Sequence, residues 1–257
     1  MRRNGYVIIK TMSRSARKMH LAAAGYELLH LPPAGELTVQ ELEYVKTKRI
    51  LFGHMSVGQN MCDGIVPLYS SYGVAPPTIL TNLNQINSAS GGFFAEFGLG
   101  TNGYPLTKVA NFDTQVRLYQ AKLDIVFMKF CFLDIVADTD ISAVFNAYKS
   151  VMDGITNDFP HITVVYTTSA LAIYGVPHAV ARAQLAAMVR AEYASTGRVF
   201  DLATIESTAP DGSRVGGVSD GVPYYMPYSG YLIDGGHLNA TGAEVVDTKL
   251  FKLLASL

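Results

Sequence analysis

Charged side chains are scarce in this chain of 257 residues. Asp, Glu, Lys and Arg make up only 16% of it, against about 25% in an average globular domain. The 20 basic and 21 acidic residues nearly cancel, which leaves a formal net charge of −1. Proteins that bind nucleic acid normally carry a basic domain, so this balance argues against a nucleic-acid partner. The hydrophobic fraction of 49% argues equally against disorder.

Cysteine, tryptophan and long apolar runs are also lacking. The chain has no Trp, although it has 15 Tyr, and only two cysteines, Cys62 and Cys131. Two cysteines cannot form a disulfide framework, and neither lies in a zinc-binding spacing, so we interpret both as buried free thiols. No apolar run approaches the roughly 18 to 20 residues that a membrane-spanning helix needs. We therefore expect no membrane span, no metal and no cofactor.

The first 45 residues differ from the rest of the chain. Residues 1–20 hold six basic side chains and no acidic one, and residues 21–25 read Leu-Ala-Ala-Ala-Gly. This pattern has the order of an export signal, but its apolar core is short. A solvated extension or a misassigned start explains it as well, so the compartment stays open. We divide the chain into an N-terminal extension, residues 1–45, and one catalytic domain, residues 46–257.

Apolar runs and helical periodicity alternate from residue 49 onward. The expected strands cover residues 49–52, 78–82, 124–128, 162–166 and 199–201, and the expected helices cover 57–68, 141–155, 179–193 and 241–254. Residues 88–111 have neither period and are expected to form long functional loops. Capping boxes are expected at Thr38-x-x-Glu41 and Thr241-x-x-Glu244.

This alternation predicts the fold class. Strands that alternate with helices favour a three-layer α/β/α sandwich around a central, mostly parallel five-stranded sheet, similar to flavodoxin. Ligands of such sheets bind beyond the carboxyl ends of the strands, so the residues that follow each strand are the candidates for chemistry.

Two short segments at such strand ends could form a catalytic triad. Ser56 follows the first strand in Gly53-His54-Met55-Ser56-Val57-Gly58, and Asp234 and His237 precede the last helix in Asp234-Gly235-Gly236-His237. A serine nucleophile needs an imidazole base, and that base needs an acceptor on its other nitrogen. Each segment by itself also fits a structural role, Ser56 as an N-cap and the pair as loop residues.

Together the two segments resemble the SGNH (GDSL-like) hydrolase superfamily, and within it a poorly characterised group whose first block reads Gly-His-x-Ser-Val-Gly. The resemblance covers roughly residues 48–257, and three further stretches look like that group: residues 100–108, 128–134 and 200–207. It implies that Ser56 is the nucleophile, His237 the general base and Asp234 its orienting partner.

The chain departs from the superfamily in two blocks. Met55 stands where the first block normally has an aspartate, and Leu133 stands where the third block normally supplies an oxyanion-hole asparagine. We expect the backbone N–H of Ser56 to be one oxyanion donor. Gly100 and Asn102 are the candidates for the others, with Gly91 and Gly92 as rivals. Lys129, which interrupts a buried strand, is expected to be a further donor or an ion-pair partner of Asp134.

A long glycine-rich segment, residues 207–236, precedes Asp234. Segments of this length are often binding loops, and this one carries Tyr224, Tyr225 and Tyr228. We expect these rings to cover Ser56 and bind a sugar ring, an aromatic acid or a short acyl chain. A loop that packs only on itself is the alternative.

The sequence therefore predicts a serine esterase that hydrolyses small or carbohydrate-linked carboxylic esters through an acyl-enzyme. Three alternatives stay open: acyl transfer to an alcohol by the same residues, a carbohydrate-binding module on a decayed hydrolase scaffold, and a metal hydrolase that uses Asp234, His237 and His54. The expected partner is a small-molecule ester, and the oligomeric state is left open.

Overall fold

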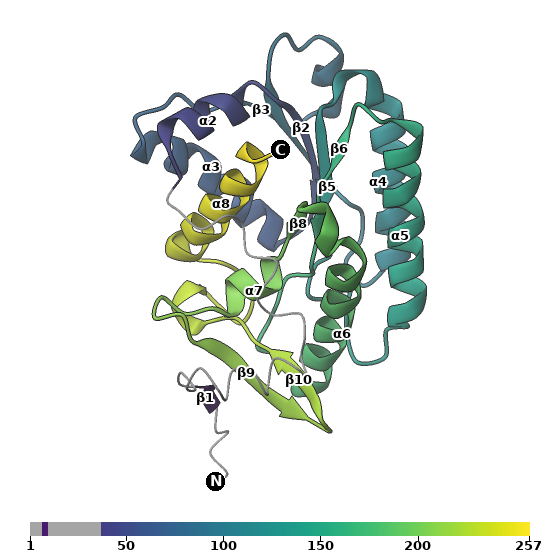
Figure 1. Cartoon of the computed structure of the whole chain (residues 1–257), viewed down its shortest axis with the longest axis vertical. Coiled ribbons are helices and arrows are strands. Elements are labelled where there is room, and N and C mark those ends of the chain that lie inside the picture. The colour runs from purple at the N-terminus through teal and green to yellow at the C-terminus, as the bar shows by residue number, and fades with distance from the viewer. Residues whose placement is uncertain (1–6, 10–36) are drawn as a thin grey trace.

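A five-stranded parallel sheet lies at the centre of the structure (Figure 1). The computed structural model describes residues 7–9 and 37–257. The strands stand in the order β3 (Thr78–Leu80), β4 (Phe93–Gly98), β2 (Arg49–His54), β5 (Ile125–Met128) and β6 (Thr163–Val164), and every neighbouring pair is parallel. The predicted fold class is confirmed, and β2, which leads into Ser56, lies between β4 and β5.

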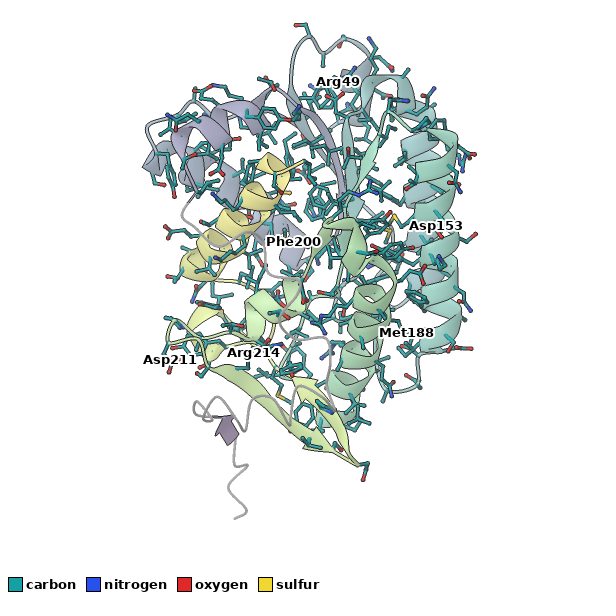
Figure 2. All side chains as sticks on the ribbon, viewed as in Figure 1. Arg49, Asp153, Met188, Phe200, Asp211 and Arg214 are labelled. Carbon is teal, nitrogen blue, oxygen red and sulfur yellow. The ribbon has the colours of Figure 1, made fainter. Side chains whose placement is uncertain are left out.

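Helices cover both faces of this sheet. The first face carries α2 (Val39–Lys46), α3 (Val57–Ser71) and α8 (Ala240–Ala255), and the second carries α4 (Pro105–Tyr119), α5 (Ile141–Asp158) and α6 (Val176–Tyr193). Side chains alternate between the faces along a strand. Phe52 accordingly joins the first core cluster and Leu51 the second. Figure 2 shows side chains filling the space between the layers.

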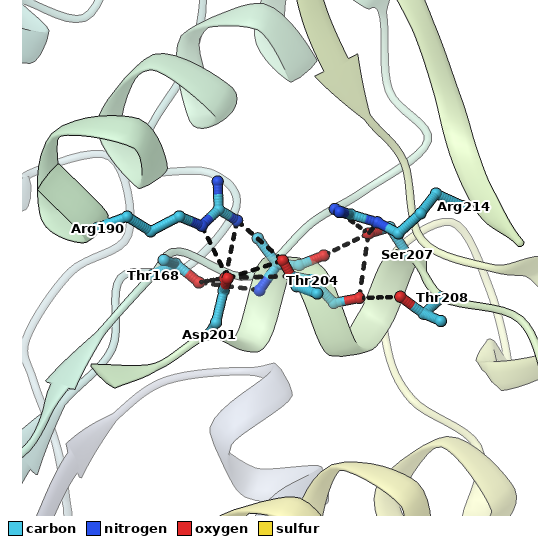
Figure 3. A network of polar contacts seen from close by, with 8 residues as sticks. Thr168, Arg190, Asp201, Thr204, Ser207, Thr208 and Arg214 are labelled. Carbon is cyan, nitrogen blue, oxygen red and sulfur yellow. Dashed lines mark hydrogen bonds and ion pairs between the residues drawn. The ribbon is translucent and has the colours of Figure 1, made fainter. Parts of the chain in front are cut away.

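A short second pair of strands extends the fold toward α6. Strand β7 (Tyr166–Thr167) pairs in parallel with β8 (Val199–Phe200), and α7 (Leu202–Ser207) follows β8. Asp201 caps α7 through the Thr204 N–H and accepts two hydrogen bonds from Arg190 of α6, at 2.7 and 2.8 Å (Figure 3). Burial alone would raise the pKa of Asp201, but the Arg190 guanidinium holds it below its usual value. Residues 200–207, one of the three further stretches in which the resemblance was found, thus make structural contacts that connect α7 to α6.

Residues 88–111 are more regular than predicted. They contain β4 and the first part of α4 instead of long loops. Glu96 breaks the apolar pattern of β4, and its partner, His54 of β2, is 42 residues away in sequence. The strand is therefore specified by pairing with β2 and β3, which a local pattern does not reveal.

Residues 207–236 are also not one long loop. They hold an antiparallel hairpin of β9 (Arg214–Ser219) and β10 (Val222–Tyr225), followed by a short 3₁₀ turn, η4 (Ser229–Tyr231). The two residues between the strands, Asp220 and Gly221, both have positive φ, as the two-residue turns that join the strands of a hairpin require. Strand β1 (Val7–Ile9) pairs with the other edge of β9.

The ends of the chain's helices test the two expected capping boxes. The Thr38 box is confirmed, because the Thr38 hydroxyl and the Glu41 carboxylate each accept the other residue's backbone N–H. The box at Thr241 is wrong: α8 begins one residue earlier, and the Asn239 side chain caps it by accepting from the Gly242 N–H. Further 3₁₀ turns are η1 (Leu83–Asn87), η2 (Gln120–Lys122) and η3 (Ala194–Thr196).

Helix α2 packs on α8, and Glu41 accepts a hydrogen bond from Lys252 at 2.6 Å. The proposed division at residues 45 and 46 stays a prediction, and the signal-like stretch 21–25 lies outside the described residues. The expected absence of a membrane-spanning helix is a separate question. Within the part of the chain that the structure describes, no helix has both the length and the apolar character to cross a membrane.

Candidate active site

Ser56 stands on a strained turn between β2 and α3. Its φ of 57° and ψ of −110° are rare for a residue with a β-carbon, and such backbone strain gathers at functional sites. Ser56 occupies the N-cap position of α3, yet its side chain makes no capping hydrogen bond. The close turn also requires Gly58, because a Cβ there would lie 2.3 Å from the Cβ of His54. The hydroxyl is thus free of the structural role that a serine at this position usually has.

His237 and Asp234 complete a hydrogen-bonded chain that begins at Ser56. The Ser56 Oγ lies 2.6 Å from His237 Nε2, and His237 Nδ1 lies 2.7 Å from Asp234 Oδ2. The other carboxylate oxygen of Asp234 accepts the N–H groups of His237 and Gly236, each at 2.8 Å. These N–H groups and the imidazole lower the pKa of Asp234 to about 2. The structure therefore brings together the three residues that the sequence named, and their catalytic roles stay predictions.

Backbone and amide contacts fix the loop that carries His237. Asn60, on the first turn of α3, accepts the Leu238 N–H at 3.1 Å. Ile173 donates its N–H to the Gly235 carbonyl at 2.9 Å, and Ile233 donates to the His237 carbonyl at 3.0 Å. Asn60 thereby couples the helix that follows Ser56 to the loop that holds His237. Sequence analysis did not select Asn60, although it lies only four positions after Ser56.

Two aromatic rings that sequence analysis did not select lie against the loop that carries His237. Phe132 packs edge-on to the imidazole, with ring centroids 5.8 Å apart, and Tyr174 lies 5.9 Å from Phe132. The buried Phe132 ring favours glycine at position 236, because a Cβ there would lie 2.6 Å from it, and a Cβ at Gly235 would lie 2.3 Å from the Tyr174 hydroxyl, which would have to move. Phe132 falls in a stretch that the resemblance marked, whereas nothing in the sequence marks Tyr174.

The three tyrosines selected from the sequence make their described contacts elsewhere. The ring of Tyr225 lies under the Arg214 guanidinium, 3.7 Å from its centroid, and Tyr228 packs against Tyr231. A Cβ at Gly217 would lie 2.8 Å from the Tyr224 hydroxyl, so Tyr224 covers its own hairpin. These contacts agree better with the alternative of a segment that packs on itself, and a role in substrate binding stays a prediction.

The candidate oxyanion donors follow β4, which neighbours β2. Gly98 pairs with His54 in the sheet, so Gly100 and Ser56 each stand two residues beyond the last pair of that ladder. The Asn102 Oδ1 accepts from Lys108 Nζ at 2.6 Å. A lysine can only donate, so this contact leaves the amide N–H₂ as the end of Asn102 that can donate to a substrate.

The rival donors are at the wrong end of the sheet. Gly91 and Gly92 precede β4, and a Cβ at Gly92 would lie 2.1 Å from the Lys46 carbonyl. Parallel strands bring their carboxyl ends together, so residues that precede β4 lie at the edge opposite Ser56.

Asp134 ties the two loops that flank Ser56. Its carboxylate accepts the N–H of Gly103 at 2.8 Å, the N–H of Cys131 at 2.7 Å and Lys108 Nζ at 2.7 Å. The side chains of Lys108 and Asp134 are fully buried, so the pair compensates two charges that water does not reach. The ion-pair partner of Asp134 is therefore Lys108 and not Lys129.

Lys129 holds the backbone immediately before Ser56. Its Nζ donates to the Met55 carbonyl at 2.7 Å. Burial lowers the pKa of Lys129, and burial raises the pKa of Glu206, whose carboxylate accepts the Leu171 N–H nearby. Lys129 thus supports the turn at Met55 and Ser56 with one of its three N–H groups, and a role as a further oxyanion donor stays a prediction.

His54 does not join the triad. Its Nε2 lies 2.6 Å from Glu96 and 3.3 Å from the Cys62 thiol, and all three side chains are buried. Across residues 37–257, these three form the one group of His, Cys, Asp and Glu side chains close enough to hold a metal ion. The alternative of a metal centre at His54, Asp234 and His237 is therefore not supported by the geometry. Burial raises the pKa of the Cys62 thiol, which keeps it unreactive.

Comparisons with known proteins come from solved structures, because no family model and no curated protein matches the chain. A protein assigned to the G-D-S-L lipolytic family from Desulfitobacterium hafniense DCB-2 is 13% identical over 80% of this chain and 99% of its own, with a TM-score of 0.50. The periplasmic domain of a lipopolysaccharide acetyltransferase from Salmonella ser. Paratyphi A is 9% identical over 94% of this chain and 96% of its own, with a TM-score of 0.45. The fold that the sequence pattern predicted is found again in the first of these structures, and the chain has the fold of the SGNH (GDSL-like) hydrolase superfamily.

Proposed function

We propose that this protein is a serine hydrolase of carboxylic esters that works through an acyl-enzyme. The observation that carries the proposal is the unbroken series of short contacts from the Ser56 hydroxyl through His237 to Asp234. The strained turn at Ser56 and its unused capping capacity support it. An intact triad argues against a decayed binding module, which would have no reason to keep all three groups in contact.

The proposed mechanism has two halves. The Ser56 oxygen attacks the ester carbonyl while His237 Nε2 takes the hydroxyl proton, and the ionised Asp234 stabilises the resulting imidazolium. His237 then gives that proton to the departing alcohol, which leaves the acyl group on Ser56. In the second half, His237 takes a proton from water, the water oxygen attacks the acyl carbon, and Ser56 recovers its proton as the acid departs.

The negative oxygen of each tetrahedral intermediate needs hydrogen-bond donors. The Ser56 N–H lies at the start of α3, where the helix dipole favours negative charge. The Gly100 N–H and the Asn102 amide are the proposed partners, held in place by Lys108 and Asp134. This arrangement replaces the asparagine that the third block of the superfamily normally supplies.

A fluorophosphonate probe tests the proposal directly. We expect the probe to attach to Ser56, as shown by mass spectrometry of the labelled peptide, and to abolish hydrolysis of p-nitrophenyl acetate in proportion to labelling. A protein that neither reacts with the probe nor hydrolyses short esters would contradict the proposed function. Addition of an acceptor alcohol separates hydrolysis from transfer, because a transferase would form a new ester at the expense of free acid.

Replacing Asn102 by alanine tests the oxyanion assignment. Removal of one donor typically costs about 10² to 10³ in kcat, and we expect a loss of that size for Asn102→Ala with little change in KM. The neighbouring Thr101 is exposed, so Thr101→Ala is a matched control that should keep the wild-type kcat. An Asn102→Ala enzyme whose kcat stays within threefold of the wild-type value would remove Asn102 from the oxyanion hole.

A further inference from the structure

A pocket of about 520 Å³ lies between the loops that follow the two strands on either side of β2. One wall is the start of α4 with the residues before it, and the other is the loop after β5 with the first turn of α5. Its volume is within the range of pockets that bind small organic molecules, about 300 to 1,000 Å³. None of the three residues of the candidate triad lines this pocket.

The pocket adjoins the candidate active site. Leu133 lines it, and the preceding residue, Phe132, packs against the imidazole of His237. Gly103 also lines it, and this residue directly follows the proposed oxyanion donor Asn102. A group attached to an ester carbonyl at Ser56 would therefore lie within reach of this pocket.

Apolar side chains dominate the lining. Tyr104, Leu106 and Leu133 are 61%, 49% and 48% exposed, and Val136 and Val144 lie with them. Two of the pocket's carboxylates already have donors, since Asp134 binds Lys108 and Asp140 caps α5 through the Ala143 N–H. The third carboxylate of the lining, Asp138, is exposed to solvent. The lining therefore offers mainly apolar contact.

Exposed apolar side chains also gather around the site as a whole. Six of the eleven large hydrophobic side chains that are exposed in the described chain lie on loops or helix starts that border it: Tyr104, Leu106, Leu133, Ile173, Tyr174 and Ile233. Concentrated exposed apolar surface commonly marks a binding site, because its exposure to water is unfavourable.

We propose that this pocket binds an apolar chain of the ester, contributed by either its acyl or its alcohol part. The proposal rests on the proposed function and names the substrate class of the same site. Each methylene moved from water into such a pocket contributes about 0.8 kcal/mol, which corresponds to a gain of about fourfold in kcat/KM for every carbon that the pocket encloses.

Two series of substrates test the inference. The first lengthens the acyl part from p-nitrophenyl acetate to the octanoate, and the second lengthens the alcohol part from ethyl acetate to octyl acetate. We expect kcat/KM to rise with chain length in one series by about fourfold per enclosed methylene, and that series identifies which part of the ester occupies the pocket.

A bulky substitution then tests whether the pocket causes the dependence of kcat/KM on chain length. Ala143 is exposed and lines the pocket on the first turn of α5, so Ala143→Phe should fill it and lower the preference for the longest over the shortest ester at least tenfold. Ser150→Phe, at another exposed position of α5, adds the same side chain away from the pocket and should leave this preference unchanged.

The outcomes are distinguishable. Turnover of short esters with no chain-length dependence in either series would overturn the inference and leave the proposed function standing, and an unaltered preference in Ala143→Phe would do the same. A protein that hydrolyses no ester would overturn both.

Discussion

Replacing Ser56 by alanine is expected to lower kcat for p-nitrophenyl acetate by a factor of about 10⁴ or more. The substitution removes the hydroxyl that lies 2.6 Å from His237 Nε2 and keeps the β-carbon. No capping bond is lost, because the Ser56 side chain makes none. Steady-state kinetics with the purified variant measures the loss, and thermal unfolding measures stability, which should change by no more than about 0.5 kcal/mol.

Ser56→Gly separates the hydroxyl from the backbone strain. A residue in a sparsely populated backbone region costs about 1 to 3 kcal/mol, and glycine relieves such strain. We therefore expect Ser56→Gly to be as inactive as Ser56→Ala and more stable than it. Substantial activity in either variant would show that another group is the nucleophile.

The sheet could be predicted where its strands are uninterrupted apolar runs. Strand β5, residues 125–128 of the expected strand 124–128, is the example, because strands covered on both faces read as apolar stretches. The expected strand 162–166 is divided in the structure between β6 of the central sheet and β7 of the two-stranded sheet. Strand β4 was missed because Glu96 interrupts it and because the compensating His54 is remote in sequence. A burial pattern that depends on a distant partner leaves no local signal.

The β9–β10 hairpin was missed although a signal was present. Asp220-Gly221 is a preferred pair for a two-residue hairpin turn, and apolar Val218 and Val222 flank it. The glycines of the flanking strands concealed it, because glycine is depleted in strands and typical of loops. Gly216 is needed there for another reason: a Cβ would lie 2.2 Å from the Tyr224 carbonyl across the hairpin.

The residues of the candidate site also fall into two groups, those that the sequence predicts and those that it does not. Ser56, Asp234 and His237 could be named because their chemistry demands those residue types and because both segments precede helices. Their supports could not be named, since Asn60, Phe132 and Tyr174 act through contacts that only the folded chain creates. The pairing of Lys108 with Asp134 was not predicted either, because Lys108 lies in residues 88–111, which show no helical period, although the structure buries it in α4.

Replacing Asp234 by asparagine is expected to lower kcat by roughly 10⁴ while the loop keeps its shape. Asparagine retains one oxygen, which can still accept the Gly236 and His237 N–H groups. Its amide N–H₂ would face His237 Nδ1, so that nitrogen becomes the acceptor and Nε2 carries the proton. In this tautomer Nε2 cannot take the proton of Ser56.

The pH profile and a charge-matched control complete this test. Because the pKa of Asp234 is about 2, its carboxylate stays ionised above about pH 3, so Asp234 should contribute no limb to the wild-type pH profile of kcat above that pH. Asp158→Asn removes the same charge from an exposed ion pair with Arg117 on the far helix layer and should leave kcat unchanged. An Asp234→Asn enzyme that keeps more than a tenth of the wild-type kcat would mean that the carboxylate does not set the tautomer, and that His237 is oriented by its backbone contacts alone.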